Sequence, residues 1–460
     1  MNVKDKAGSP PELSSRIGGA SAVPDGPRAV RKAAFAATLS TSLEWYDFYI
    51  YATAAALVFN KTFFATDSEV VAAMNSFATV ALGFVARPIG GIVAGHFGDK
   101  YGRKPILVLS ILLMGLSTTL VGFVPNTSIV WLAPALLICL RLLQGLAVGG
   151  QWGGAVLIVT EYAPRNRRGF FGSFAQLGIP IGMILGNGVF LAMTWALAPD
   201  AFTSWGWRVP FWGSLLMVVV GFAIHRYLEE TPEFQQAEAT LATAPARRRS
   251  PILEVVRHNG GTLLLAGGTY LVGIAMFYIT MTGSVQVATT TLGMDRSDVL
   301  SWILLAALVM IPIVPTTAYL SDRFGRKLIY GIGIAGMGIW AVPMWMLIGS
   351  ATPENPARLG IAVVVSCAIM SIQTGPQAAL FAELFPPETR YSGASLGYQS
   401  AAILGGMSPM AMVALVNGQV ENIWRVGLMI VVLAVVALIC LLGLVRRDAK
   451  RRGEVQVTRG

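Results

Sequence analysis

The chain has 460 residues, of which 54% are hydrophobic and 13% charged, and its formal net charge is +10. Soluble domains carry about 25% charged residues, so this composition excludes a soluble multidomain enzyme, and the apolar content excludes a disordered chain. Basic chains bind nucleic acid when Lys and Arg form a surface stripe, but here these residues lie between apolar runs. We therefore expect the lipid bilayer, and not nucleic acid, as the partner of this surface.

The apolar runs, taken in chain order, predict the fold class. Residues 1–32 are polar and predict a cytoplasmic tail, and no cleavable signal peptide is visible. Each following run is long enough for a spanning helix, which needs about 20 apolar residues. The runs lie near 33–59, 72–96, 105–124, 130–160, 169–197 and 207–227, and then near 260–290, 299–320, 328–349, 358–382, 391–417 and 424–445. They predict an all-α membrane protein with twelve transmembrane helices in two six-helix bundles.

A polar stretch separates the two sets of runs and predicts the domain organisation. We expect an N-terminal bundle over 33–227, a cytoplasmic linker over 228–259, a C-terminal bundle over 260–445 and a cytoplasmic tail over 446–460. The tails, the linker and the alternate loops hold 27 of the 34 Lys and Arg residues. By the positive-inside rule, both termini face the cytoplasm of a multi-pass protein of the cell (inner) membrane.

A loop motif occurs twice in the chain. Gly-Asp-Lys-Tyr-Gly-Arg-Lys follows the second run and contains Asp99 and Arg103. Asp-Arg-Phe-Gly-Arg-Lys follows the eighth run and contains Asp322 and Arg326. The two Asp residues are 223 positions apart.

A second motif repeats at nearly the same offset. Glu161 precedes Arg168 by seven residues, and Glu383 precedes Arg390 by seven, with 222 positions between the two Glu residues. Two unrelated motifs at nearly one offset indicate a duplicated six-helix unit. Two pseudo-symmetric bundles place a substrate site between them near the middle of the membrane.

These motifs resemble the major facilitator superfamily. The loop over 95–104 and its copy over 322–327 carry most of the resemblance. Glu-Trp-Tyr-Asp-Phe over 44–48, Arg-Leu-Leu-Gln-Gly over 141–145 and Tyr-Ser-Gly-Ala over 391–394 are similar to the metabolite:proton symporters, which include shikimate, 2-oxoglutarate, citrate and proline/betaine transporters. The resemblance implies a carrier that is not an enzyme, is driven by a proton gradient and needs no cofactor.

Ionisable side chains are rare within the predicted spans. The four strongly ionisable ones are Glu44, Asp47, Arg87 and Arg141. Each costs roughly 2.5–3.5 kcal/mol or more at a helix centre, so each needs a partner or water. At 1.5 Å per residue, Asp47 lies about 18 Å from the outer end of the first span and Arg141 about 16 Å from that of the fourth. The two residues are nearly level and can form a pair.

The level pair predicts a protonation switch. Charged Asp47 would hold Arg141, and a proton on Asp47 would free the guanidinium, whose planar fork suits a carboxylate substrate. The resemblance supports these roles, because proton-coupled sugar porters of the same superfamily use an Asp in the first span and an Arg in the fourth. A fixed structural ion pair is the alternative. Many relatives have Glu where this chain has Gln151, so no proton role is carried over to that position.

The other two charged residues leave more than one interpretation open. Glu44 shares a helix face with Asp47 and is either a second proton relay or a carboxylate near the cytoplasmic mouth. Arg87 either packs structurally, with its head group reaching toward the inner end of its span, or attracts substrate.

Neutral side chains complete the candidate substrate site. Gln176 lies in a stretch that resembles the fifth span of sugar porters, where a Gln binds substrate, although a hydrogen bond between helices would also account for it. Trp45 and Tyr49 could wall a ring-shaped ligand, with ordinary packing as the alternative. The remaining candidates are polar side chains within spans, namely Gln144, Tyr278, Gln373, Gln377, Tyr398 and Gln399.

The repeated loop motifs predict gates. Asp99 and Asp322 can each face a helix N-terminus across the interface between the bundles, where negative charge is favourable. Basic and acidic residues can pair to close the cytoplasmic side, namely Arg103, Arg168, Arg326 and Arg390 with Glu161, Glu383 or Glu229. A solvated basic face that only sets the topology is the alternative.

Together these features predict a monomeric secondary transporter that takes up a small organic anion with protons by alternating access. The substrate class is a shikimate-like, aromatic or di/tricarboxylic acid, and Arg141 is the reason for expecting an anion. A zwitterionic osmolyte of the proline/betaine type and a proton-antiporting exporter are the alternatives. We expect no metal, because the three cysteines stand alone within apolar runs.

Overall fold

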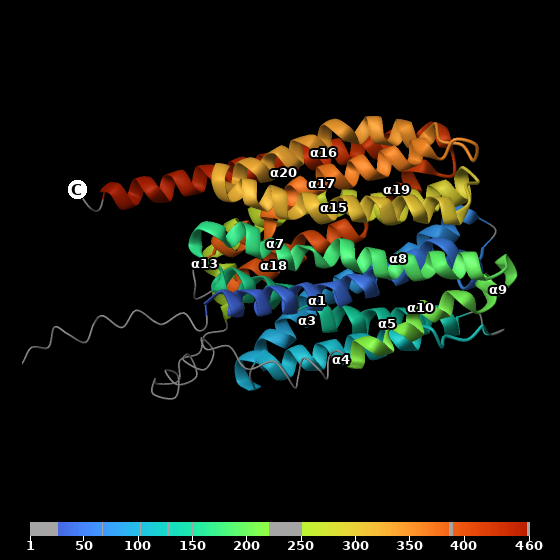
Figure 1. The fold of residues 1–460 in the computed structure, drawn as a ribbon, viewed down its shortest axis with the longest axis horizontal. Coiled ribbons are helices and arrows are strands. Elements are labelled where there is room, and N and C mark those ends of the chain that lie inside the picture. Colours follow the sequence, from blue (N-terminus) through green and yellow to red (C-terminus); the bar gives the residue numbers. More distant parts are fainter. Residues whose placement is uncertain are drawn as a thin grey trace, which may run out of the picture.

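The computed structural model describes residues 26–66, 68–101, 103–126, 129, 131–149, 151–219, 251–385 and 390–457. Over these residues the chain is almost entirely helical. The helices lie side by side along the long axis of the molecule (Figure 1). The all-α prediction is confirmed.

The first half starts with α1 (Gly26–Ala54), which continues through the π-helix η2 (Ala55–Phe59) into α2 (Asn60–Thr62). The next elements are α3 (Glu69–Tyr101), α4 (Arg103–Val121), α5 (Leu132–Val148) and α6 (Gln151–Tyr162). They are followed by η3 (Arg165–Arg167), α7 (Arg168–Gln176), α8 (Gly178–Ala196), α9 (Pro199–Ser204), η4 (Gly206–Arg208) and α10 (Val209–Gly213).

The second half starts with α13 (Pro251–Tyr278), followed by the π-helix η5 (Ile279–Gly283), α14 (Ser284–Gln286) and the π-helix η6 (Val287–Thr291). The long helices α15 (Arg296–Phe324), α16 (Arg326–Gly349) and α17 (Ala357–Glu383) come next. The half ends with α18 (Arg390–Gly406), α19 (Ser408–Val416), η8 (Val420–Asn422) and α20 (Trp424–Val457).

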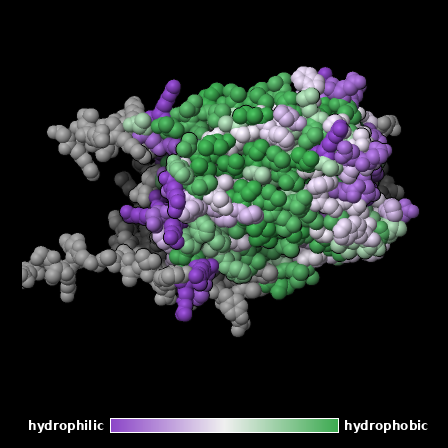
Figure 2. All heavy atoms as spheres, turned by 45° about the horizontal axis from the view of Figure 1, so that its top comes forward, coloured by the Kyte–Doolittle hydropathy of each residue, from purple (hydrophilic) through white to green (hydrophobic). Residues whose placement is uncertain are grey.

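Nine helical segments of the described residues are long and apolar enough to cross a membrane. The other three predicted spans correspond to α1, which contains Glu44 and Asp47, to Val108–Val121 of α4, and to the segment that begins with α10. The face drawn in Figure 2 has a broad apolar band between hydrophilic ends. This arrangement agrees with the predicted twelve-helix fold of a multi-pass membrane protein.

Two helices extend beyond the predicted spans. α1 begins at Gly26, inside the predicted tail, and α20 continues to Val457, beyond the predicted end at 445. Hydropathy marks only the part of a helix that lies in lipid. The extension of α20 contains Arg446, Arg447 and Ala449, which are good helix formers and continue the helix into water.

The two halves pack against each other through α7 and α8, which contact α15, and through α3, which contacts α18 and α19. Within the first half, α3 and α5 approach very closely because glycines line their contact. A Cβ atom at Gly145 would lie 2.2 Å from the carbonyl oxygen of Gly83, and one at Gly149 would lie 2.0 Å from the carbonyl oxygen of Arg87. This close approach brings the polar side chains of α3 and α5 beside those of α1.

A π-helical turn interrupts the first helix of each half. η2 begins at residue 55 and η5 at residue 279, so the two turns are 224 positions apart. This offset is close to those of the repeated loop motifs, so both halves share the irregularity as well as the motifs. Single π-helical turns are frequent at functional sites.

Candidate functional site

α1 and α5 bring Asp47 and Arg141 together inside the first half. Nη1 of Arg141 lies 3.5 Å from Oδ2 of Asp47, and the two side chains are 6% and 4% exposed. A buried charge without a partner is strongly destabilising. The opposite charges of Asp47 and Arg141 therefore stabilise each other at the same depth in the membrane. The contact expected from the sequence is present, and its role as a switch stays a prediction.

Two neutral side chains bind the ion pair. Gln144 accepts a hydrogen bond from Nη1 of Arg141 at 3.0 Å, and its Nε2 donates to Oδ1 of Asp47 at 2.9 Å. The Thr118 hydroxyl on α4 also donates to Oδ1 of Asp47 and accepts from Nε2 of Gln144 at 2.8 Å. The sequence analysis predicted that Gln144 contacts substrate. In the structure its amide is hydrogen-bonded to both members of the ion pair.

An aromatic ring covers the guanidinium. Cζ of Arg141 lies 3.6 Å from the ring centre of Tyr51, and the Tyr51 hydroxyl donates to Thr79 at 2.9 Å. Such a cation–π contact stabilises a buried guanidinium. The sequence prediction missed Tyr51 and Thr118. Two signals pointed to them: Tyr51 follows Asp47 by four residues on one helix face, and Thr118 belongs to a polar Ser-Thr-Thr run within an apolar helix.

Glu44 and Arg87 are buried near the pair. Arg87 lies on α3 with its Cζ 4.4 Å from the ring centre of Phe84, and Glu44 lies one turn before Asp47 on α1. A cavity opens between these helices. It is lined by Asp47, Phe84, Arg87, Arg141, Gln144 and their neighbours. A water molecule in this cavity would lie beside both arginines and the carboxylate.

Aromatic side chains from both halves meet next to the ion pair. Trp45 of α1 lies 5.0 Å from Phe277 of α13 between ring centres, and Phe48 lies 4.6 Å from Tyr278. The hydroxyls of Tyr49 and Tyr278 are buried and have no hydrogen-bond partner within the described part of the chain. The predicted residues Trp45, Tyr49 and Tyr278 are therefore brought together at the interface between the halves.

Amides also meet across this interface. Nε2 of Gln176 on α7 donates to Oε1 of Gln377 on α17 at 3.0 Å. Nε2 of Gln377 is buried, and none of the described residues accepts a hydrogen bond from it. Gln373 is used within its own half, where it donates to the carbonyl of Thr269 at 3.1 Å. The structure therefore places Gln176 and Gln377 at the interface between the halves. The amide of Gln373 is hydrogen-bonded within the second half.

Tyr398 is held between two rings. It stacks on Trp152 of the first half with ring centres 4.0 Å apart and an interplanar angle of 13°, and on Tyr270 at 4.9 Å. Oε1 of the neighbouring Gln399 is buried and accepts no hydrogen bond from the described residues. Tyr398 therefore contributes to the contact between the halves.

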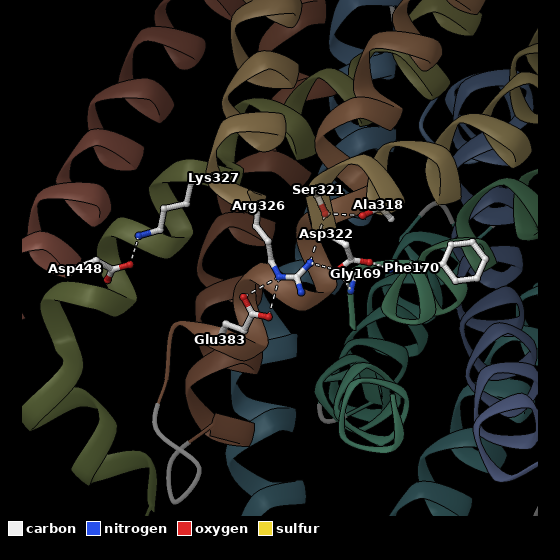
Figure 3. A network of polar contacts seen from close by, with 9 residues as sticks. All are labelled: Gly169, Phe170, Ala318, Ser321, Asp322, Arg326, Lys327, Glu383 and Asp448. Carbon is white, nitrogen blue, oxygen red and sulfur yellow. Dashed lines mark hydrogen bonds and ion pairs between the residues drawn. The ribbon is translucent and has the colours of Figure 1, made fainter. Parts of the chain in front are cut away.

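Asp322 of the repeated motif in the second half accepts hydrogen bonds from a helix of the first half. Oδ1 of Asp322 accepts from the backbone N–H of Gly169 and Oδ2 from that of Phe170, each at 2.9 Å (Figure 3). These N–H groups belong to the first turn of α7, where the helix dipole favours a negative charge. The helix N-terminus predicted for Asp322 is therefore the start of α7.

Arg326 extends this contact within the second half. Its Nη1 donates to Oδ1 of Asp322 at 2.9 Å, and its Nε lies 2.8 Å from both carboxylate oxygens of Glu383 (Figure 3). The predicted pairing of Arg326 with Glu383 is present. Nε of Arg390 donates to the carbonyl of Phe385 at 3.4 Å.

Other predicted gate residues lie nearby. Glu161, Arg168, Glu383 and Arg390 line one small pocket at this end of the molecule. The side chains of Asp99, Arg103 and Glu229 lie outside the described residues, so their predicted contacts are not part of the structure.

The halves also touch at the opposite end. Nδ2 of Asn60 on α2 donates to Oε1 of Gln286 on α14 at 3.4 Å. The guanidinium of Arg296 at the start of α15 lies 5.1 Å from the ring centre of Phe202 on α9. Contacts at both ends enclose the aromatic and amide groups between them.

Two family models match the two halves of the chain. Residues 32–250 match the family described as "Sugar (and other) transporter", and residues 272–459 match "Major Facilitator Superfamily". Over 417 residues the chain is 38% identical to the inner membrane metabolite transport protein YhjE of Escherichia coli (strain K12), covering 89% of this chain and 93% of that protein.

The chain belongs to the major facilitator superfamily. It is 34% identical over 423 residues to the shikimate transporter of Escherichia coli (strain K12), covering 92% of this chain and 95% of that protein. A structure of the proton:xylose symporter XylE bound to 6-bromo-6-deoxy-D-glucose matches with a TM-score of 0.72 at 20% identity, over 91% of this chain and 96% of that one, and shares the fold. The chain is therefore a metabolite transporter of the membrane and not an enzyme.

Proposed function

We propose that the protein takes up a small organic anion together with protons across the inner membrane. The buried pair of Asp47 and Arg141 beside a cavity is the observation that supports this proposal. An intramembrane carboxylate and guanidinium are costly and typical of ion and substrate pathways. In this proposal the carrier acts as a monomer, and both termini and the Asp322 gate face the cytoplasm.

The orphaned polar groups between the halves provide substrate contacts in this proposal. The hydroxyls of Tyr49 and Tyr278 and the amide of Gln377 are buried without a partner among the described residues. Unpaired buried donors are costly, and a substrate with a carboxylate and hydroxyls would pair them. Trp45 and Phe277 lie next to these groups and would pack against an alicyclic or aromatic ring.

Purified protein in proteoliposomes tests the proposal. We expect one or more alicyclic, aromatic or di/tricarboxylic acids, offered as radiolabelled substrates, to accumulate above the external concentration when the outside is more acidic. A protonophore should abolish this accumulation. Uptake of betaine or proline alone would contradict an anionic substrate, and accumulation that ignores the pH gradient would contradict proton coupling.

We also propose that Asp322 is the latch of the cytoplasmic gate. Asp322→Ala removes two hydrogen bonds between the halves that involve a charged group, each worth about 1.5 kcal/mol or more. The two bonds together are worth about 3 kcal/mol, and 1.4 kcal/mol is a factor of ten in population, so the inward-open state should gain about a hundredfold. The readout is the rate at which a membrane-impermeant thiol reagent, applied from the cytoplasmic side, labels Ala382→Cys in a cysteine-free background.

Asp448 offers a matched control for the latch. It binds Lys327 at the same end of the molecule, but both residues belong to the second half. Asp448→Ala should therefore leave the labelling rate unchanged. Equal labelling rates for Asp322→Ala and Asp448→Ala in folded protein would show that Asp322 is no latch.

A further inference from the structure

The side-chain amide of Gln144 has only one orientation that satisfies its neighbours. The guanidinium of Arg141 can only donate hydrogen bonds, and the ionised carboxylate of Asp47 can only accept them. Oε1 of Gln144 therefore faces Nη1 of Arg141, and Nε2 faces Oδ1 of Asp47. The side chain is 1% exposed, so bulk solvent does not replace these two partners.

A proton on Asp47 meets a different environment at each carboxylate oxygen. Oδ1 already accepts hydrogen bonds from Nε2 of Gln144 and from the Thr118 hydroxyl, whereas Oδ2 faces Nη1 of Arg141 at 3.5 Å. The two donors on Oδ1 leave Oδ2 as the oxygen that takes the proton. Protonated Oδ2 is a donor that faces the donor Nη1, so Arg141 loses the negative charge and the acceptor of Asp47 at the same time.

We propose that Gln144 is a positioning residue that couples proton uptake by Asp47 to the release of Arg141. Together with Thr118, the second donor to Oδ1, it sets the pH at which the release occurs. This inference rests on the proposed function, because it concerns the same proton site.

The carboxylate of Asp47 also has charged and titratable neighbours. The titratable and charged groups that interact with Asp47 are Glu44, Tyr46 and Tyr51 on its own helix, Arg87 on α3 and Arg141 on α5. The hydroxyl of Tyr46 donates to the carbonyl of Pro210 at 2.6 Å, and that of Tyr51 donates to Thr79. α8, which packs along α1, contains no charged residue.

The second half provides an internal comparison. The residue 223 positions after Asp47 is Tyr270, and the residues 222 positions after Arg141 and Gln144 are Val363 and Ser366. The Ser366 hydroxyl donates to the carbonyl of Ala362 in its own helix at 2.6 Å. A six-helix bundle of this fold therefore forms without the charged pair and without the amide. Packing of the six helices therefore does not require the hydrogen-bonded network of Asp47, Arg141 and Gln144 that the first half contains.

The pH dependence of uptake into proteoliposomes tests the inference. Gln144→Met keeps the length of the side chain, and Thr118→Val keeps its shape, but each removes a hydrogen bond to the charged form of Asp47. Because such a bond favours the charged form, its loss should move half-maximal uptake to a higher pH by about one unit. Thr119→Val is the matched control, since the Thr119 hydroxyl donates to the carbonyl of Gly115 in its own helix, and its midpoint should equal that of wild type.

A parallel Asp47→Asn variant separates the two ways of failing. If Asp47→Asn keeps the wild-type pH dependence, the proposed proton site is wrong. If Asp47→Asn loses the pH dependence while Gln144→Met and Thr118→Val keep the wild-type midpoint, the proton site stands and the role of Gln144 is overturned. Should Gln144→Met fail to fold, Gln144→Leu provides the same measurement with a smaller side chain.

Discussion

Asp47→Asn should abolish the accumulation of substrate against its gradient and leave the exchange of labelled for unlabelled substrate active. Asn has nearly the shape of a protonated Asp and cannot take up or release a proton, so Arg141 stays available to substrate while coupling is lost. Uphill uptake driven by a pH gradient measures the first effect, and counterflow in preloaded proteoliposomes measures the second. We expect the accumulation ratio to fall to about one, since no proton gradient is then coupled to the substrate.

Asp200 gives the matched control for this substitution. It is an exposed carboxylate on α9, at the opposite end of the molecule from the first turn of α7, which binds Asp322. Asp200→Asn should accumulate substrate as wild type does. Uphill uptake by folded Asp47→Asn, at the wild-type level, would refute the protonation switch.

Gly145→Val should prevent stable folding. A Cβ atom at this position lies 2.2 Å from the carbonyl oxygen of Gly83 and 2.7 Å from Cβ of Ala86, and the backbone of α3 cannot move aside as a flexible side chain could. Separating α3 from α5 also displaces Arg141 and Gln144 from Asp47. Overpacking of this kind costs on the order of 3 kcal/mol or more. Loss of the monodisperse peak on size exclusion in detergent, or a large fall in the unfolding temperature, measures the effect.

Gly188 on α8 is the comparison for this packing argument. A Cβ atom there would have no heavy atom within 4 Å apart from the adjacent backbone of its own helix, so Gly188→Val should fold and remain stable. If Gly145→Val were as stable as Gly188→Val, the close contact of α3 and α5 would be wrong.

The helices could be predicted well because each span is a local property of the sequence. Twenty apolar residues predict a span without any knowledge of its neighbours. The ends of α1 and α20 could not be predicted in this way. Polar residues such as Arg446 and its neighbours can form either a helix or a loop in water, so hydropathy does not distinguish the two.

The ion pair could be predicted because charges inside spans are rare and their depth follows from helix geometry. Thr118 and Tyr51 were missed because a neutral hydroxyl or ring costs little inside a span and gives no signal of its contacts. Gln144 was expected to contact substrate, since an amide can serve a ligand or a neighbour equally well. Only the packing of α1, α4 and α5 shows that its two polar atoms already have partners.

The π-helical turns of η2 and η5 bear on the origin of the chain. An additional residue in a helical turn arises by insertion, and two independent insertions at matching places of both halves would be a coincidence. A turn present in the ancestral six-helix unit before its duplication accounts for both. It has persisted in both descendants, although one of them has Asp47 and the other Tyr270 at corresponding positions.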